Sequence, residues 1–236
     1  MQQSQHQMMG YDRAITMFSP DGRLLQVEYA KKTVKQGSTA IGVTCKDGVV
    51  LVTDKRIGDS LIIAESVDKI FEVDEHIIAT ASGIIPDARV LVERSQAQAQ
   101  QHQITFDSPI DVISIVKDLA SLMQLTTQSG GYRPFGVSML IGGVDKDGVK
   151  LYNVDPVGVY NQYRATAIGE KGEEAANLLR EQWKESLSVQ EAIKLAISVL
   201  KEVIGQDLDV DRVDCAYINH DMTIKRLEKD AIKEHL

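Results

Sequence analysis

Apolar and polar residues alternate along this chain in blocks that predict strands and helices in turn. Four strand-length apolar runs come first, at 39–45, 49–53, 69–73 and 76–82. Helical spacing follows at about 86–101 and 108–127. Three more apolar runs occupy 135–144, 150–154 and 159–168, before helical patterns at about 170–185 and 188–204. A last hairpin is expected at 213–218 and 223–227, with a short charged helix at 228–236.

The order of these blocks predicts the fold class. Strands and helices come in separate groups rather than in strict strand–helix–strand alternation, which favours two sheets stacked face to face with helices outside. We therefore expect an α+β fold of four layers, a sandwich of two antiparallel sheets between helix layers. The helix at 108–127 is apolar over more than one face, which suggests that a second surface, such as that of a neighbouring subunit, covers it.

An additional segment precedes the first strand. Residues 1–10 carry no charged side chain and are expected to form a flexible tail, ahead of one domain that spans 11–236. Ser19-Pro-Asp-Gly22 predicts a turn. Apolar residues then recur at helical spacing, predicting an amphipathic helix over about 23–36 that stops at Gly37.

Composition and charge narrow the function. The chain has 236 residues, 43% of them hydrophobic, and a net charge of -8, which argues against a general nucleic-acid binder. No apolar run approaches the length of a membrane helix, which is roughly 18 residues, and the N-terminus does not resemble a secretory signal. Cys45 and Cys215 are predicted to be buried free thiols. These features favour a soluble protein of the cytoplasm, with no nucleic-acid or membrane partner.

Ser38, Asp54 and Lys69 form the most suggestive chemical pattern. A hydroxyl at a newly exposed N-terminus can use its own α-amine as a base, with a lysine to stabilise negative charge and an aspartate to orient the lysine. That chemistry requires cleavage between Gly37 and Ser38. The alternative is a strand start, a strand-end aspartate and a surface lysine, and the residues alone favour this alternative. The five histidines are scattered and no nucleotide-binding motif occurs, so we expect no metal site and no cofactor.

Several motifs resemble one known family. The segment from Tyr11 to Ala30 is similar to the N-terminal signature of proteasome α subunits of the archaeal type. Matching motifs follow in order at 37–40, 82–83, 87–89, 133–138 and 155–158. The resemblance implies the N-terminal nucleophile hydrolase-like fold with an extra N-terminal helix. It also implies a heptameric ring of identical subunits that caps rings of proteolytic β subunits, within a threonine-type endopeptidase complex.

The resemblance also implies a site for an activator. Lys69 is expected to pair with the terminal carboxylate of a tail from a regulatory ATPase ring. Gly37, Gly83 and Ile84 are expected to line the same pocket, because glycine lets a peptide backbone approach closely. Unfolded protein would pass through the ring as substrate in transit, and the α ring would template assembly of the β ring.

A second set of residues is implied to act as a gate. The tail before Tyr11 would close the ring axis, and Tyr11, Asp12, Pro20 and Tyr29 would form the cluster that stabilises the open form. In this interpretation the chain itself is not an enzyme and has no catalytic residue. Two alternatives remain: a self-processed N-terminal nucleophile peptidase that uses Ser38, and a ring scaffold without proteolytic partners.

Overall fold

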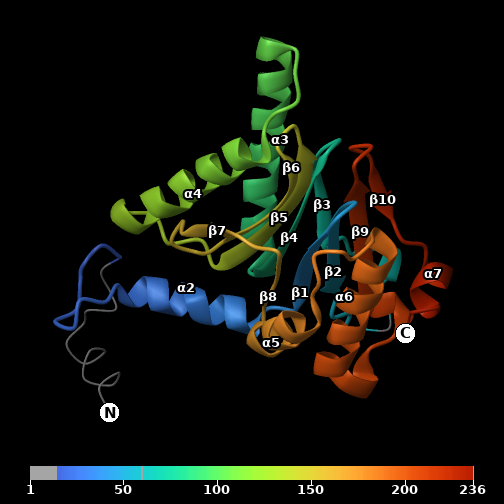
Figure 1. Cartoon of the computed structure of the whole chain (residues 1–236). Coiled ribbons are helices and arrows are strands. Elements are labelled where there is room, and N and C mark those ends of the chain that lie inside the picture. Colours follow the sequence, from blue (N-terminus) through green and yellow to red (C-terminus); the bar gives the residue numbers. More distant parts are fainter. Residues whose placement is uncertain (1–14, 60, 236) are drawn as a thin grey trace.

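Two antiparallel sheets of five strands each form the centre of the computed structural model, which describes residues 15–59 and 61–235 (Figure 1). The first sheet has the order β10-β9-β2-β1-β8. Its strands are β1 (Ala40–Cys45), β2 (Gly48–Asp54), β8 (Ala165–Ile168), β9 (Val213–Asn219) and β10 (Ile224–Arg226). The second has the order β3-β4-β5-β6-β7. It contains β3 (Ile70–Asp74), β4 (Ile77–Gly83), β5 (Val137–Asp145), β6 (Gly148–Val154) and β7 (Tyr160–Gln162).

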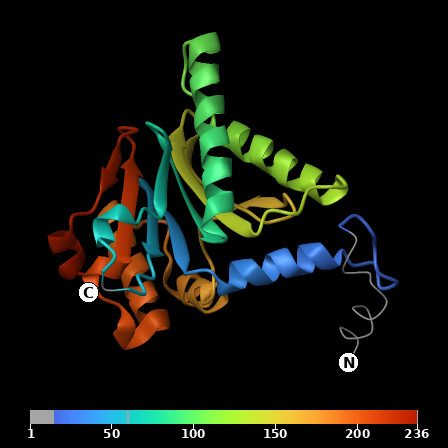
Figure 2. The same ribbon diagram turned by 180° about the vertical axis from the view of Figure 1, so that it is seen from behind.

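Helices cover the outer face of each sheet. The helices α3 (Ile85–Phe106) and α4 (Val112–Gln128) pack on the second sheet, while α5 (Gly172–Gln182) and α6 (Val189–Ile204) pack on the first. A third apolar cluster fills the space between the sheets, where residues of β2, β4, β5 and β6 meet. The predicted sandwich of two sheets between two helix layers is thus confirmed (Figures 1 and 2).

The predicted elements occur in the predicted order. Helix α6 begins with a capping box, in which Ser188 and Glu191 satisfy each other's backbone N–H groups. Short 3₁₀ turns lie at Ala64–Ser66, Gly205–Asp207 and Val210–Arg212, and α7 (Lys229–Lys233) is the last helix. Cys45 and Cys215 are both buried free thiols, as expected. Within the described residues, no helix combines the length and the apolar character needed to cross a membrane.

One predicted strand is in fact two strands of different sheets. The apolar run 159–168 was expected to be continuous, but β7 pairs with β6 and β8 pairs with β1. Between them, Tyr163 donates its backbone N–H to Leu151 O, while Arg164 O accepts from Thr44 N. The chain therefore crosses from one sheet to the other at these two residues. Apolar periodicity shows that a segment is extended, but it does not show which sheet the segment joins.

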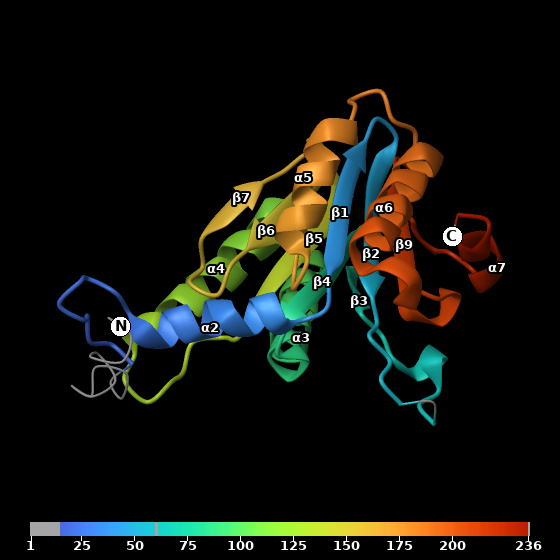
Figure 3. The ribbon, with the colours of Figure 1, turned by 90° about the horizontal axis from the view of Figure 1, so that it is seen from below.

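Helix α2 (Leu25–Gln36) lies across one end of the sandwich, and its last residue leads directly toward β1 (Figure 3). The predicted turn before it is present, since Gly22 donates its N–H to Ser19 O and has a positive φ of 73°. Leu25, Val27 and Ala30 form its buried face. The segment 15–24 lies at the outer end of the helix, away from the strands (Figures 1 and 3). The expected extra N-terminal helix is therefore present, and it starts two residues later than predicted.

Candidate functional site

Hydrogen bonds to three parts of the sandwich hold helix α2 against the sheets. The Thr33 hydroxyl donates to Gly136 O at 3.0 Å, ahead of β5, and the Ser82 hydroxyl on β4 donates to Val34 O at 3.2 Å. Glu170 donates its backbone N–H to Gly37 O at 2.9 Å. The helix is therefore fastened to the sheets mainly through its C-terminal half, next to the residues that the sequence singled out.

Gly37 ends the helix for a different reason from the predicted one. Its φ of -72° is accessible to any residue, so no left-handed conformation requires glycine here. Instead, a Cβ at this position would lie 2.2 Å from Gly83 N and 2.4 Å from Ser82 Oγ. Gly83 has a φ of 118°, and its own Cβ would lie 2.2 Å from Gly136 O. Two glycines in contact thus allow α2 to approach the end of β4.

Lys69 lies at the same end of the sandwich, immediately before β3. The backbone N–H groups of Lys69 and Ile70 donate to Asp214 Oδ2 at 3.4 and 3.3 Å. The Lys69 carbonyl accepts from the Thr80 hydroxyl at 2.8 Å. Only 6% of the residue is exposed. Its ammonium donates to Ala81 O at 3.5 Å, and the structure gives it no ion pair among the described residues.

Burial is the main cause of the unusual titration of this lysine. It lowers the pKa of Lys69 to about 8; the negative charge of Asp54 opposes the shift, and the positive charge of Arg56 adds to it. A buried ammonium without a carboxylate partner is costly, and an anion that reached it would relieve that cost. The site therefore favours binding of a negatively charged group from outside the described chain.

Asp54 accepts its hydrogen bonds from Arg212 and Arg56. This carboxylate is almost fully buried, and it accepts from Arg212 Nε at 3.0 Å and from Arg212 Nη2 at 2.9 Å. It also accepts from the backbone N–H of Arg56 at 2.9 Å. Ser38 is buried as well, and its hydroxyl has no hydrogen-bond partner among the described residues. Asp54 donates its N–H to Thr39 O, next to Ser38, and its charge reaches Lys69, but among the hydrogen bonds of the described residues none joins Asp54 to the lysine.

The other predicted residues are only partly described. Ile84 is half-buried; it directly precedes α3 and donates its N–H to Gly136 O at 3.0 Å. Pro20 is exposed in the turn before α2, and Tyr29 lies on α2 with Lys32 Nζ 5.6 Å from its ring centre. Tyr11 and Asp12 lie outside the described residues, as does the tail 1–10. The gate cluster therefore stays a prediction.

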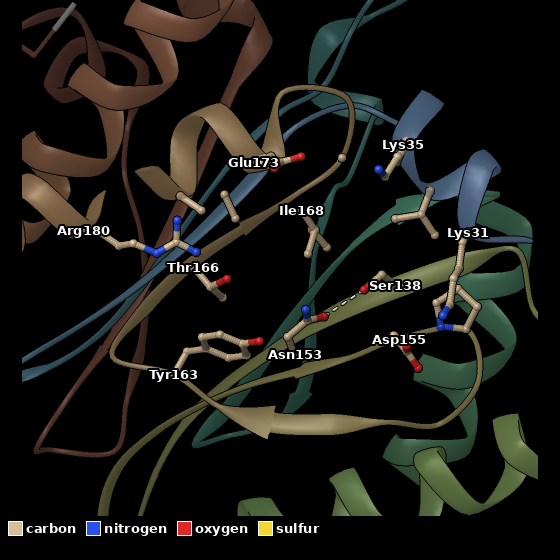
Figure 4. A pocket seen from close by; sticks show the side chains of 16 residues that line it. Lys31, Lys35, Ser138, Asn153, Asp155, Tyr163, Thr166, Ile168, Glu173 and Arg180 are labelled. Atoms are coloured by element: carbon tan, nitrogen blue, oxygen red, sulfur yellow. Dashed lines mark hydrogen bonds between the residues drawn. The ribbon is translucent and has the colours of Figure 1, made fainter. Parts of the chain in front are cut away.

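A cavity of about 450 Å³ lies beside α2 (Figure 4). It is bounded by α2, β5, β6, β8 and α5, and both lysines and carboxylates line it, among them Lys31, Lys35, Asp155 and Glu173. Ser138 donates to Asn153 across its floor at 2.8 Å. Of the residues predicted for the activator site or the gate, none that the structure describes lines this cavity.

Comparison with known proteins agrees with the sequence motifs. Residues 11–32 match a family model described as the N-terminal signature of the A-type proteasome subunits, and residues 34–218 match the model described as proteasome subunit. The chain belongs to the proteasome α-subunit family. The first match ends at residue 32 and the second begins at residue 34, so both include part of α2.

Three archaeal proteins, each named as the alpha subunit of the proteasome, illustrate how far this similarity extends. The protein of Methanopyrus kandleri is 46% identical over 224 residues, which cover 95% of this chain and 91% of the relative. That of Archaeoglobus fulgidus is 44% identical, covering 97% of this chain and 93% of the relative. That of Pyrococcus abyssi is 46% identical, covering 96% and 87%. The α-type proteasome fold therefore extends over nearly the whole chain.

Three residues of the site were not predicted from the sequence. Arg56, Glu170 and Arg212 are linked to Asp54 or to the end of α2, and Arg212 is 158 positions away from Asp54 in the sequence. Glu170 lies ahead of α5, which starts at Gly172, and it pairs with Arg56. No local pattern in the sequence indicates these long-range pairs.

Proposed function

We propose that this chain is a non-catalytic subunit of a heptameric α ring in the proteasome core particle. In this role it gates the passage of unfolded protein to the proteolytic β subunits, templates the β ring and docks the C-terminal tails of a regulatory ATPase ring. The single observation that carries the docking role is the buried ammonium of Lys69, which has no ion pair among the described residues. The terminal carboxylate of a tail supplies the charge that this site lacks.

The geometry around Ser38 supports a non-catalytic role. A peptidase of this fold needs a free α-amine on its nucleophile and a lysine oriented by an aspartate. Here α2 is hydrogen-bonded in place ahead of Ser38, and Asp54 is paired with Arg212. The self-processing alternative gains no support from this arrangement, because its key carboxylate already has another partner.

Exposed apolar side chains support contacts with further subunits. Val90, Ile104 and Phe106 on α3 and Leu125 on α4 are each more than half exposed. Large exposed apolar residues on one helix layer are typical of surfaces that bind another protein. We assign this layer to the contact with the β ring. If the chain were only a scaffold, it would form rings but would not co-purify with a β subunit.

The docking role is tested by Lys69→Ala in reconstituted core particles. ATPase-stimulated breakdown of a folded protein is expected to be lost, while cleavage of a small fluorogenic peptide by the core stays near the wild-type rate. The control is Lys225→Ala, which removes an exposed lysine that is paired with Asp221. Normal stimulation in the Lys69 variant would contradict the docking role.

The gating role is tested by deleting residues 1–10. Removal of the tail is expected to raise the basal degradation of an unfolded protein in the absence of any ATPase, because nothing then closes the axis of the ring. Degradation at the wild-type rate would show that the tail is not a barrier.

A further inference from the structure

Arg56 has a backbone conformation that residues with long side chains seldom adopt. Its φ is 47°, in the left-handed region, where a Cβ is crowded by the backbone. Such a conformation persists only where surrounding contacts impose it. One of these contacts is the hydrogen bond of 2.9 Å from the Arg56 N–H to Asp54 Oδ1. Asp54 is itself fixed by Arg212, so the backbone of Arg56 is anchored to a rigid carboxylate.

The side chain of Arg56 joins the end of α2 to the loop before α5. Its Nη1 donates to Gln36 O, the last residue of α2, at 3.1 Å, and its Nη2 pairs with the carboxylate of Glu170. Glu170 in turn donates its backbone N–H to Gly37 O at 2.9 Å. Arg56 and Glu170 therefore bind consecutive carbonyl groups at the C-terminal end of the helix. A cation at this end also suits the helix dipole.

Arg56 and Lys69 both lie near the C-terminal end of α2. Arg56 binds Gln36 O, while Lys69 Nζ donates to Ala81 O, next to Ser82, whose hydroxyl bonds Val34 O. The positive charge of Arg56 is also one of the causes that lower the pKa of Lys69, after burial. The Arg56 side chain is 45% exposed and that of Glu170 is 53% exposed, so a molecule bound from outside can reach the guanidinium. A carboxylate that approaches Lys69 thus meets a second cation, which at present pairs with Glu170 and, at 4.0 Å, with Asp54.

We propose that Arg56 is a latch between α2 and the body of the subunit, released when a peptide with a free C-terminal carboxylate binds at Lys69. The bound carboxylate competes with Glu170 for the guanidinium, which weakens the bond from Arg56 to Gln36 O and loosens the end of α2. Arg56 is thus a positioning residue that couples occupancy of the site to the helix. This inference rests on the docking function proposed for Lys69.

The latch predicts changes in affinity of opposite sign for its two members. Tail peptide from the regulatory ATPase of the same organism, labelled with fluorescein, would be titrated against assembled rings of the full chain. Glu170→Gln removes the competitor for the guanidinium, and is expected to tighten binding about twofold to fivefold, the range of an exposed ion pair. Arg56→Ala is expected to weaken binding about fivefold or more, and Arg56→Lys to restore most of the loss.

A matched control separates the latch from a general effect of charge. Asp221→Asn removes one negative charge from another exposed pair, with Lys225, whose side chains are 49% and 42% exposed. It is expected to leave the affinity unchanged. If Arg56 had only a structural role, loss of either latch residue would weaken binding. Weaker or unchanged binding in Glu170→Gln, with Lys69→Ala still abolishing binding, would overturn the latch and leave the docking function intact.

Hydrogen exchange tests the latch without relying on affinity. The backbone amides at the C-terminal end of α2 are expected to exchange faster in Glu170→Gln than in the wild type, and faster in the wild type once peptide is added. Unchanged exchange in Glu170→Gln would overturn the latch whatever the affinities are. If wild-type rings bound no tail peptide, the docking function would fail, and with it the proposed coupling.

Discussion

Binding of a carboxylate at Lys69 is expected to depend on pH in a range where an ordinary lysine does not titrate. The pKa of this lysine is lowered from 10.5 to about 8, chiefly by burial. A carboxylate binds the charged ammonium, which predominates below that pKa. Affinity is therefore present at neutral pH and is lost as the pH rises through about 8.

The size of the effect follows from the titration of one group. With a pKa of about 8, about 90% of the lysine is charged at about pH 7 and about 10% at about pH 9, so affinity falls about tenfold. A charge-assisted hydrogen bond contributes about 1.5–3 kcal/mol, or roughly 10- to 150-fold in affinity. Loss of the charge can therefore account for the whole tenfold decrease.

The assay is fluorescence anisotropy of the tail peptide bound to assembled rings at several pH values. Lys69→Arg is the key variant, because a guanidinium stays charged throughout this range and binding should become independent of pH. A peptide that ends in an amide controls for titration elsewhere on the ring. Wild-type affinity that stayed constant up to about pH 9 would refute the reasoning, as would a Lys69→Arg profile parallel to that of the wild type.

Two further predictions concern Gly37, at the end of α2, and Asp87, in the first turn of α3. Gly37→Ala places a Cβ 2.2 Å from Gly83 N, and overpacking of this kind is expected to lower the free energy of unfolding by about 1–3 kcal/mol, measured by denaturant unfolding. The control is Gly130→Ala, because a Cβ there would meet nothing within 4 Å. Equal stability of the two variants would contradict the contact between Gly37 and Gly83. Asp87→Asn breaks two bonds of 2.6 Å from Arg133 and is expected to cost about 1–3 kcal/mol at neutral pH. Burial raises the pKa of Asp87, but the hydrogen bonds from Arg133 outweigh it and hold the pKa below 3.8. The difference in free energy of unfolding between wild type and variant should therefore vanish as the pH falls through the pKa of Asp87 in the folded protein. A stability difference that persisted in acid would contradict this.

The sequence predicted the sandwich because its strands and helices carry strong local signals. The hairpin of β1 and β2 has a short turn between apolar runs, and α6 begins with a capping box that the spacing of Ser188 and Glu191 makes recognisable. The split of 159–168 between two sheets could not be predicted in this way. Which sheet a strand joins depends on partners far away in the sequence, here β6 and β1.

The candidate site was predicted in part. The motifs indicated Lys69, Gly37, Gly83 and Ile84, and the structure places Lys69 and both glycines at one end of the sandwich. The partner of Asp54 was not predictable, because Arg212 is 158 positions away and no local spacing connects the two. The sequence also could not show why residue 37 is glycine, since its contact with Gly83 depends on how α2 packs against the end of β4.

The non-catalytic role proposed for this chain requires that α2 stay attached ahead of Ser38 in the mature protein. Intact mass spectrometry of the protein, purified from assembled particles, measures whether it does. We expect a mass that still includes α2 and Gly37, whether or not the initiating methionine is removed. A mass that lacked the first 37 residues, with Ser38 as the new N-terminus, would contradict this claim and identify a peptidase.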